Sequence, residues 1–157
     1  MTDDEKIIGY IENGIVIDHI PQGRVWQIVE LLHLNDPMRY EGGIFSLGDG
    51  YESRKVGKKG ILKVEGVSLR KNDIDLVALV AKEATISEIE NGRIKQKYDA
   101  EIPEVLDGVV NCPNLNCITN DETQRVMSKI YSGDDLFMCH YCRSEFGEDK
   151  IKFLGGK

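Results

Sequence analysis

Over the first hundred residues, the hydrophobic positions change repeatedly from the periodicity of strands to that of helices. The segment GIVIDHIP (14–21) predicts a strand that ends at a proline, which lacks a backbone donor and favours a turn. In GRVWQIVELLHL (23–34), apolar residues recur at the spacing of one helical face. The residues on this face are Val25, Ile28, Val29 and Leu32. The chain therefore opens with a strand and an amphipathic helix.

The same alternation continues through the middle of the chain. GGIFSLG (42–48) and GILKVEG (60–66) predict two strands bounded by glycines, joined by a polar loop at 49–59. NDIDLVALVA (72–81) then predicts a second helix with an Asn or Asp cap.

A β-hairpin completes this part of the chain. ATISEIE (84–90) and RIKQKY (93–98) flank Asn91-Gly92, the strongest two-residue hairpin signal. IIGYIENG (7–14) adds one more candidate extended segment. The order strand–helix–strand–strand–helix–strand, plus one strand, is a split βαβ arrangement. We expect an α+β, ferredoxin-like antiparallel sheet with two helices on one face.

The last third of the chain predicts a small all-β domain. RVMSKIYS (125–132) and DLFMC (135–139) flank a turn and indicate a hairpin, with IKFL (151–154) as a possible last strand. The acidic, proline-containing segment 99–108 predicts a linker. We therefore expect two domains, residues 1–100 and residues 104–157.

The four cysteines of the chain form two close pairs separated by a long loop. Cys112 and Cys117 enclose four residues, Cys139 and Cys142 enclose two, and twenty-one residues separate the pairs. This double spacing is typical of a closed tetrahedral metal site, with one structural zinc ion per chain and a zinc-ribbon (rubredoxin-like) fold. Such an ion would also stabilise a piece too small to bury a large core, contributing about 10–16 kcal/mol.

Other interpretations of the cysteines are weaker. Two disulfides suit a secreted protein, and a redox C-x-x-C needs a βαβ context that this region lacks. His140 lies between two of the cysteines, but four thiolates already complete the coordination shell. We expect His140 to be an exposed residue at the tip of the metal-binding turn.

Composition and charge exclude several classes of protein. The net charge is −7, divided as −3 over residues 1–100 and −4 over the remainder, and zinc with four thiolates would take the second value to about −6. Neither part has the basic excess that binding to a phosphate backbone requires, so we expect no nucleic-acid partner. The apolar stretches are too short to cross a bilayer and MTDDEK lacks the features of a signal peptide, so we expect a cytoplasmic protein without a membrane partner.

No catalytic motif stands out in the first domain, but basic residues gather in one stretch. Five of them lie within ten residues: Arg54, Lys55, Lys58, Lys59 and Lys63. We expect the run from Arg54 to Lys59 to be a solvated loop. Lys63 lies within an apolar strand, and Lys97 lies on the last strand, so both are candidates for binding phosphate. By spacing alone, either is more simply an outward-facing strand residue.

Asp18 and His19 stand near the end of the first strand and have two interpretations. They can receive ribose or base groups of a nucleotide. Alternatively, the Asp18 carboxylate bonds to nearby backbone in a turn, which spacing alone favours.

Taken together, VIDHIP (16–21), LKVEG (62–66), ATISEIEN (84–91), CPNLNCIT (112–119) and CHYC (139–142) resemble the regulatory chain of aspartate carbamoyltransferase. The resemblance extends over about residues 7–153. It implies a non-catalytic chain whose first domain binds nucleoside triphosphates and pairs with a second regulatory chain. CTP would inhibit the partner enzyme and ATP would activate it, with UTP as a further effector. The zinc domain would dock on the catalytic chain, two trimers joining three regulatory dimers in pyrimidine biosynthesis.

The resemblance also implies roles for individual residues. It makes Lys63 and Lys97 nucleotide contacts and places Asp18 and His19 at the effector site. It matches Ile11, Ile89 and Ile94 to contacts with base and sugar, and Asn114 and Asn116 to the interface with the catalytic chain. Tyr10 and Ser87 depart from the family, whose best-known members have a small residue and an amide side chain there. Both lie near the base, so the dominant nucleotide and the sign of its effect stay open.

Three other functions also stay open at this point. A zinc ribbon that binds nucleic acid fits the cysteines but not the acidic charge of either domain. An enzyme, either a transferase or a thiol oxidoreductase, lacks a supporting set of acid, base and nucleophile. A small-molecule-sensing module with another partner is opposed only by the resemblance.

Overall fold

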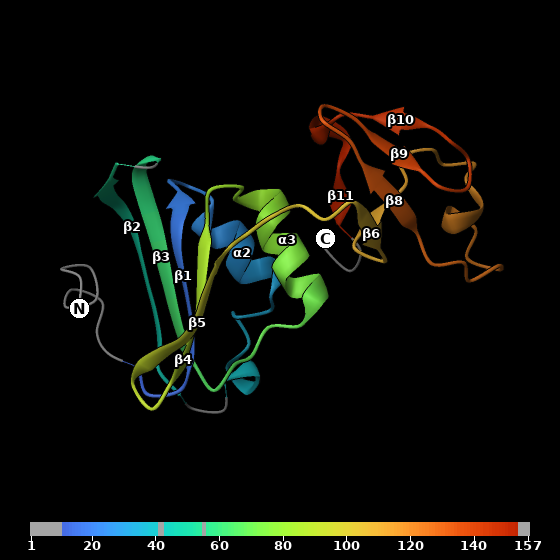
Figure 1. The fold of residues 1–157 in the computed structure, drawn as a ribbon. Coiled ribbons are helices and arrows are strands. Elements are labelled where there is room, and N and C mark those ends of the chain that lie inside the picture. The colour runs from blue at the N-terminus through green and yellow to red at the C-terminus, as the bar shows by residue number, and fades with distance from the viewer. Residues whose placement is uncertain (1–10, 41–42, 55, 154–157) are drawn as a thin grey trace. The chain divides into compact units, whose positions relative to one another are not determined.

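The computed structural model describes residues 11–40, 43–54 and 56–153, which are drawn in colour in Figure 1. The chain divides into two compact units, Met1–Glu101 and Ile102–Lys157. Tyr10, Lys55 and the first half (residues 7–10) of the candidate segment at residues 7–14 lie outside the described residues. Among the residues that the structure does describe, no helix has the length and apolar character needed to cross a membrane.

The first unit combines one antiparallel sheet with two helices. Its strands are β1 (Gly14–Pro21), β2 (Phe45–Ser53), β3 (Gly57–Glu65), β4 (Thr85–Glu90) and β5 (Arg93–Asp99), and its helices are α2 (Val25–Leu31), α3 (Lys71–Val80) and the short 3-10 helix η1 (Pro37–Arg39). The strand order is β2-β3-β1-β4-β5, with all neighbours antiparallel. Figure 1 shows α2 and α3 on the same side of the sheet. The predicted α+β, ferredoxin-like architecture is confirmed.

One face of the sheet forms the core beneath the helices. Gly60 of β3 faces α2, because a Cβ atom built on it would lie 3.2 Å from Cβ of Val25. Alternate residues of a strand share a face, so Leu62 and Val64 point the same way. Their partners in β1, Ile17 and Ile15, are also buried. The predicted helical positions Val25, Ile28, Val29 and Leu32 are all buried in this core.

Two local predictions for this unit are wrong. The segment 49–59 is not a loop, because β2 and β3 pair through most of it and only residues 54–56 separate the two strands. The cap of α3 is Arg70 rather than an Asn or Asp. Asp73 instead lies in the first turn, where its carboxylate accepts the backbone N–H of Arg70 at 2.9 Å. This bond satisfies a donor that the helix itself leaves unpaired.

The second unit is small, and most of its regular elements are short strands. They are β6 (Val105–Asp107), β7 (Val110–Asn111), β8 (Lys129–Ser132), β9 (Phe137–Cys139), β10 (Glu145–Phe146) and β11 (Lys152–Phe153), with 3-10 helices η2 (Ile118–Asn120) and η3 (Glu148–Lys150). A four-stranded sheet has the order β10-β9-β8-β6, and β11 pairs with β7. The predicted hairpin is confirmed as β8 and β9. The predicted linker at 99–108 is wrong in part, because β6 lies within it.

Candidate metal centre and nucleotide-binding face

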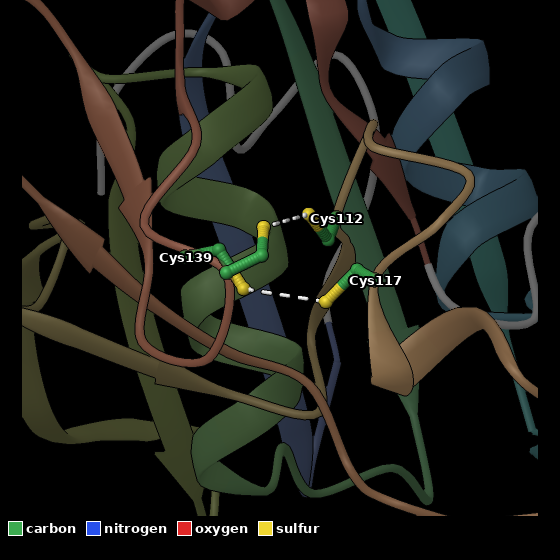
Figure 2. A group of neighbouring side chains, drawn as sticks. Cys112, Cys117 and Cys139 are labelled. Carbon is green, nitrogen blue, oxygen red and sulfur yellow. Dashed lines mark hydrogen bonds between the residues drawn. The ribbon is translucent and has the colours of Figure 1, made fainter.

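The four cysteines converge on one point in the second unit. Their sulfur atoms all lie within 4.8 Å of one another. The sulfur atoms of Cys112 and Cys142 are 3.5 Å apart, and those of Cys117 and Cys139 are 3.7 Å apart. Figure 2 shows Cys117 and Cys139 pointing toward each other, Cys117 from the residue before η2 and Cys139 from the end of β9. The structure therefore brings together all four predicted metal ligands.

The spacing of the sulfur atoms fits a tetrahedral thiolate site. With Zn–S bonds of about 2.3 Å, neighbouring sulfur atoms of a tetrahedron lie about 3.8 Å apart. The two short distances, 3.5 Å and 3.7 Å, are close to this value. Four soft ligands in this geometry suit zinc or iron. The donor set therefore fits a structural metal ion, and it leaves no ligand position for water or substrate.

Hydrogen bonds hold the first cysteine loop in shape. The side-chain amide of Asn120 donates to the carbonyl oxygens of Cys112 and Asn114, at 2.8 Å and 2.7 Å. The side-chain oxygen of Asn114 accepts the backbone N–H of Asn116 at 3.0 Å. These bonds fix the turn that carries Cys112 and Cys117. Asn114 is half-buried and Asn116 is exposed, and Leu115 between them is 84% exposed.

The environment of the thiols differs from one to the next. Burial raises the pKa of Cys112 and of Cys139. Burial also opposes ionisation of Cys142, but hydrogen bonds with the side chain and backbone of Ser144 outweigh it and lower the pKa of that thiol to about 6. Without a positive ion, the thiols of Cys112 and Cys139 therefore resist becoming thiolates. A bound cation would reverse this preference, because a coordinated thiol loses its proton.

His140 is placed differently from the prediction. It is half-buried rather than exposed, and its Nδ1 lies 2.6 Å from the hydroxyl of Tyr131. Its backbone N–H donates to the carbonyl of Lys129 at 2.9 Å. His140 therefore ties the second cysteine loop to β8 instead of standing free at the tip of the turn.

In the first unit, most of the predicted nucleotide residues lie on the face of the sheet opposite the helices, here called the helix-free face. Lys63 is on this face because it alternates with Leu62 and Val64, which point toward the helices. It belongs to one cross-strand row that runs through all five strands. In order across the sheet, the row is Ser46, Lys63, Val16, Ser87 and Lys97. Lys63 is only 3% exposed, Ser87 is buried and Lys97 is exposed.

The next row of the same face starts at Glu65 and Gly14 and is apolar on β4 and β5. Ile89 pairs with Gly14 on one side and with Ile94 on the other. Ile89 is half-buried and Ile94 is 52% exposed. Ile11, which precedes β1, is buried. The helix-free face therefore has a row with two lysines beside a row with exposed apolar surface.

Asp18 and His19 occupy a bulge in β1. The pairing of β1 with β3 shifts between Ile17 and Ile20, and His19 has a positive φ of 59°. The Asp18 carboxylate accepts the backbone N–H of His19 at 2.6 Å, which confirms the predicted turn chemistry. The His19 ring lies 3.2 Å from the hydroxyl of Thr85 on β4. Both side chains are thus held at the rim of the helix-free face.

Sequence reasoning missed Lys59, which was assigned to a solvated loop. Lys59 is 6% exposed, and its ammonium group lies 3.0 Å from Oδ1 of Asp18. It stands four residues before Lys63 on β3, so both point to the helix-free face. Arg54 and Lys58 are exposed, as predicted. The signal that could have found Lys59 is the alternation of β3 itself, which places it in phase with Lys63.

Comparison with known proteins assigns both units. The model of the aspartate carbamoyltransferase regulatory chain, allosteric domain, matches residues 6–101. The model of the metal binding domain of the same chain matches residues 104–152. This chain belongs to the aspartate carbamoyltransferase regulatory chain family. It is therefore a non-catalytic, regulatory subunit, and its four cysteines lie in the metal binding domain.

Regulatory chains of several organisms match almost the whole chain. The regulatory chain of Thermococcus kodakarensis is 37% identical over 145 residues, which is 92% of this chain and 93% of the relative. That of Pyrococcus horikoshii is 38% identical over 148 residues, 94% and 96% of the two chains. That of Porphyromonas gingivalis is 30% identical over 155 residues, 98% and 100%. The similarity therefore includes both units and the segment that joins them.

Proposed function

We propose that this regulatory chain binds nucleoside triphosphates on the helix-free face of its first unit and carries their effect to the catalytic chain through its second unit. The single observation that supports nucleotide binding most is the row across the sheet. Lys63 and Lys97 lie on it, and the apolar row of Ile89 and Ile94 lies beside it. A triphosphate with a base needs both kinds of surface next to each other.

The two rows divide the roles along the face. Lys63 and Lys97 bind the phosphates and ribose, with Lys63 as the main cation. Ile11, Ile89 and Ile94 contact the base and sugar. Asp18 and His19 complete the rim. The bond from the His19 N–H holds the Asp18 carboxylate in place, and the contact with the Thr85 hydroxyl holds the His19 ring in place. The buried Ser87 takes the position of an amide in the family, so it influences which base binds best.

The second unit binds one zinc ion and docks on the catalytic chain. Cys112, Cys117, Cys139 and Cys142 are the ligands, and the ion supplies the cross-link that this small fold needs. The loop with Asn114 and Asn116 forms part of the interface, and the highly exposed Leu115 lies between them. The zinc ion has no role in chemistry.

The assembly follows the family pattern. Regulatory chains pair through their first units, and three such pairs join two catalytic trimers in the cytoplasm. CTP inhibits and ATP activates, and UTP is a further ligand of the same site. Each nucleotide acts through its different contacts with the sheet, with a coupling free energy of about 1–3 kcal/mol.

The test is calorimetric titration of the metal-loaded chain with CTP and with ATP. Lys63→Met should weaken the binding of both nucleotides by about tenfold to a hundredfold, because it removes hydrogen bonds from a charged group. Lys58→Met is the matched control, because Lys58 lies on the same strand but alternates to the opposite face. Equal affinities in the two variants would exclude nucleotide binding at this face.

A further inference from the structure

The carboxylate of Glu65 joins two segments at the apolar end of the helix-free face. Its Oε2 accepts the backbone N–H of Glu12 at 3.0 Å, and its Oε1 accepts the backbone N–H of Ile44 at 3.0 Å. The backbone N–H of Glu65 donates in turn to the carbonyl of Ile44 at 2.8 Å. One side chain therefore connects the segment before β1 with the beginning of the edge strand β2.

The segment before β1 is also bonded to the hairpin turn between β4 and β5. The backbone N–H of Gly92 donates to the carbonyl of Glu12 at 2.8 Å. The backbone N–H of Asn91 donates to the side-chain oxygen of Asn13 at 3.1 Å. Residues 12 and 13 are thus held from two sides, by Glu65 on β3 and by the turn that follows β4.

These bonds surround the residues assigned to the base. Ile11 directly precedes Glu12, and the hairpin turn lies between Ile89 and Ile94. The row that contains Lys63 and Lys97 lies two residues further along the strands, and its side chains take no part in these bonds. The placement of Ile11 therefore depends on Glu65, whereas strand pairing places Ile89, Ile94 and the two lysines.

We propose that Glu65 is a positioning residue that sets the affinity of the effector site for the base of the nucleotide. This inference rests on the proposed function, because it assigns a role within the same site. The carboxylate uses one oxygen for each of its two backbone donors. A glutamine has the same length, but in this geometry its NH2 group replaces one of the two accepting oxygens and faces one of the two backbone N–H donors. Loss of either bond frees the segment that presents Ile11.

The experiment compares ligands with and without a base on the metal-loaded full chain. CTP, ATP and inorganic tripolyphosphate are titrated into wild type, Glu65→Gln and Lys63→Met. Glu65→Gln should weaken the binding of CTP and ATP by about tenfold, because it disturbs the end of the site that holds the base. The affinity for tripolyphosphate should stay within about twofold of the wild-type value. Lys63→Met should weaken the binding of all three ligands. Glu52→Gln is the control for charge, since Glu52 is exposed and pairs with Lys58.

Each other result overturns a defined part of the account. If Glu65→Gln weakens tripolyphosphate as much as CTP, its role is structural and the inference is wrong. If Glu65→Gln leaves CTP unchanged while Lys63→Met weakens it, the inference fails and the nucleotide site stands. If neither variant changes CTP affinity, the proposed site itself is wrong, and the inference falls with it.

Discussion

The ammonium group of Lys59 lies 3.0 Å from a carboxylate oxygen of Asp18, beside the bulge that interrupts β1. The Lys59 side chain is 7% exposed and the Asp18 side chain is 27% exposed. This ion pair therefore lies largely out of water. It joins β3 to β1 at the point where their regular pairing is interrupted.

Lys59→Met should destabilise the first unit, because it leaves the Asp18 carboxylate partly buried without its cation. Removing one partner of a fully buried pair costs about 3–5 kcal/mol, and the exposure of Asp18 reduces the expected loss to about 1–3 kcal/mol. Urea unfolding can be followed by the fluorescence of Trp26, the single tryptophan of the chain, which lies in this unit. Lys58→Met should change stability by less than about 0.5 kcal/mol, since its ion pair with Glu52 is exposed. Equal stability of the two variants would contradict this prediction.

Asn120→Ala should weaken metal binding without removing a ligand. The Asn120 amide donates hydrogen bonds to the carbonyls of Cys112 and Asn114. Loss of hydrogen bonds that hold metal ligands in place commonly lowers metal affinity by about tenfold to a hundredfold. Competition with a chromophoric chelator measures the affinity. Asn116→Ala is the control, because this exposed residue contributes only its backbone N–H to the loop. We expect Asn116→Ala to keep the metal, and wild-type affinity in Asn120→Ala would show that the loop holds its shape without the amide.

The Glu65 carboxylate should make the stability of the first unit depend on acid pH. Backbone hydrogen bonds from Glu12 and from Ile44 lower its pKa in the folded chain. A lowered folded pKa gives stability that is present above the unfolded pKa, about 4.3, and is lost as the pH falls through the folded value. The stability advantage of wild type over Glu65→Gln should therefore shrink below about pH 4.3. An advantage that stays constant from pH 6 to pH 3 would show that ionisation of Glu65 is not linked to folding.

Removal of the metal should unfold the second unit and leave nucleotide binding by the first unit intact. A small fold without its structural ion loses about 10–16 kcal/mol of coupled binding and folding free energy, so the second unit should unfold on chelation. The first unit has its own core under α2 and α3 and should keep both its Trp26 fluorescence and its affinity for CTP. Circular dichroism and calorimetry of the chelated chain measure the two effects. Equal loss of structure and CTP affinity would contradict this division of labour.

The regular elements were accessible from sequence because their signals are local. Alternating residues predicted β1 with the bounds that the structure gives, and Asn91-Gly92 predicted the hairpin turn. Both residues of that turn have positive φ, 53° and 76°, as such a turn requires. The cysteine spacing likewise predicted the cluster, since two short loops aim their thiols at one point.

The errors arose where the outcome depends on contacts between side chains of different elements. Lys59 looked like part of a solvated run, but its burial depends on pairing with Asp18, 41 residues away. His140 was expected to be exposed, but its ring lies 2.6 Å from the hydroxyl of Tyr131 on β8. The bonds of Glu65 to residues 12 and 44 leave no periodic pattern in the sequence. Such contacts exist only once the strands are placed side by side.

The most direct test of the regulatory role is sedimentation velocity of the zinc-loaded chain mixed with aspartate carbamoyltransferase catalytic trimers, with and without a chelator. The account predicts a large complex that forms with the metal and dissociates when the chelator is added. If the chain and the trimers sediment separately while the metal is shown to be bound, the second unit does not dock on the catalytic chain, and the account is contradicted.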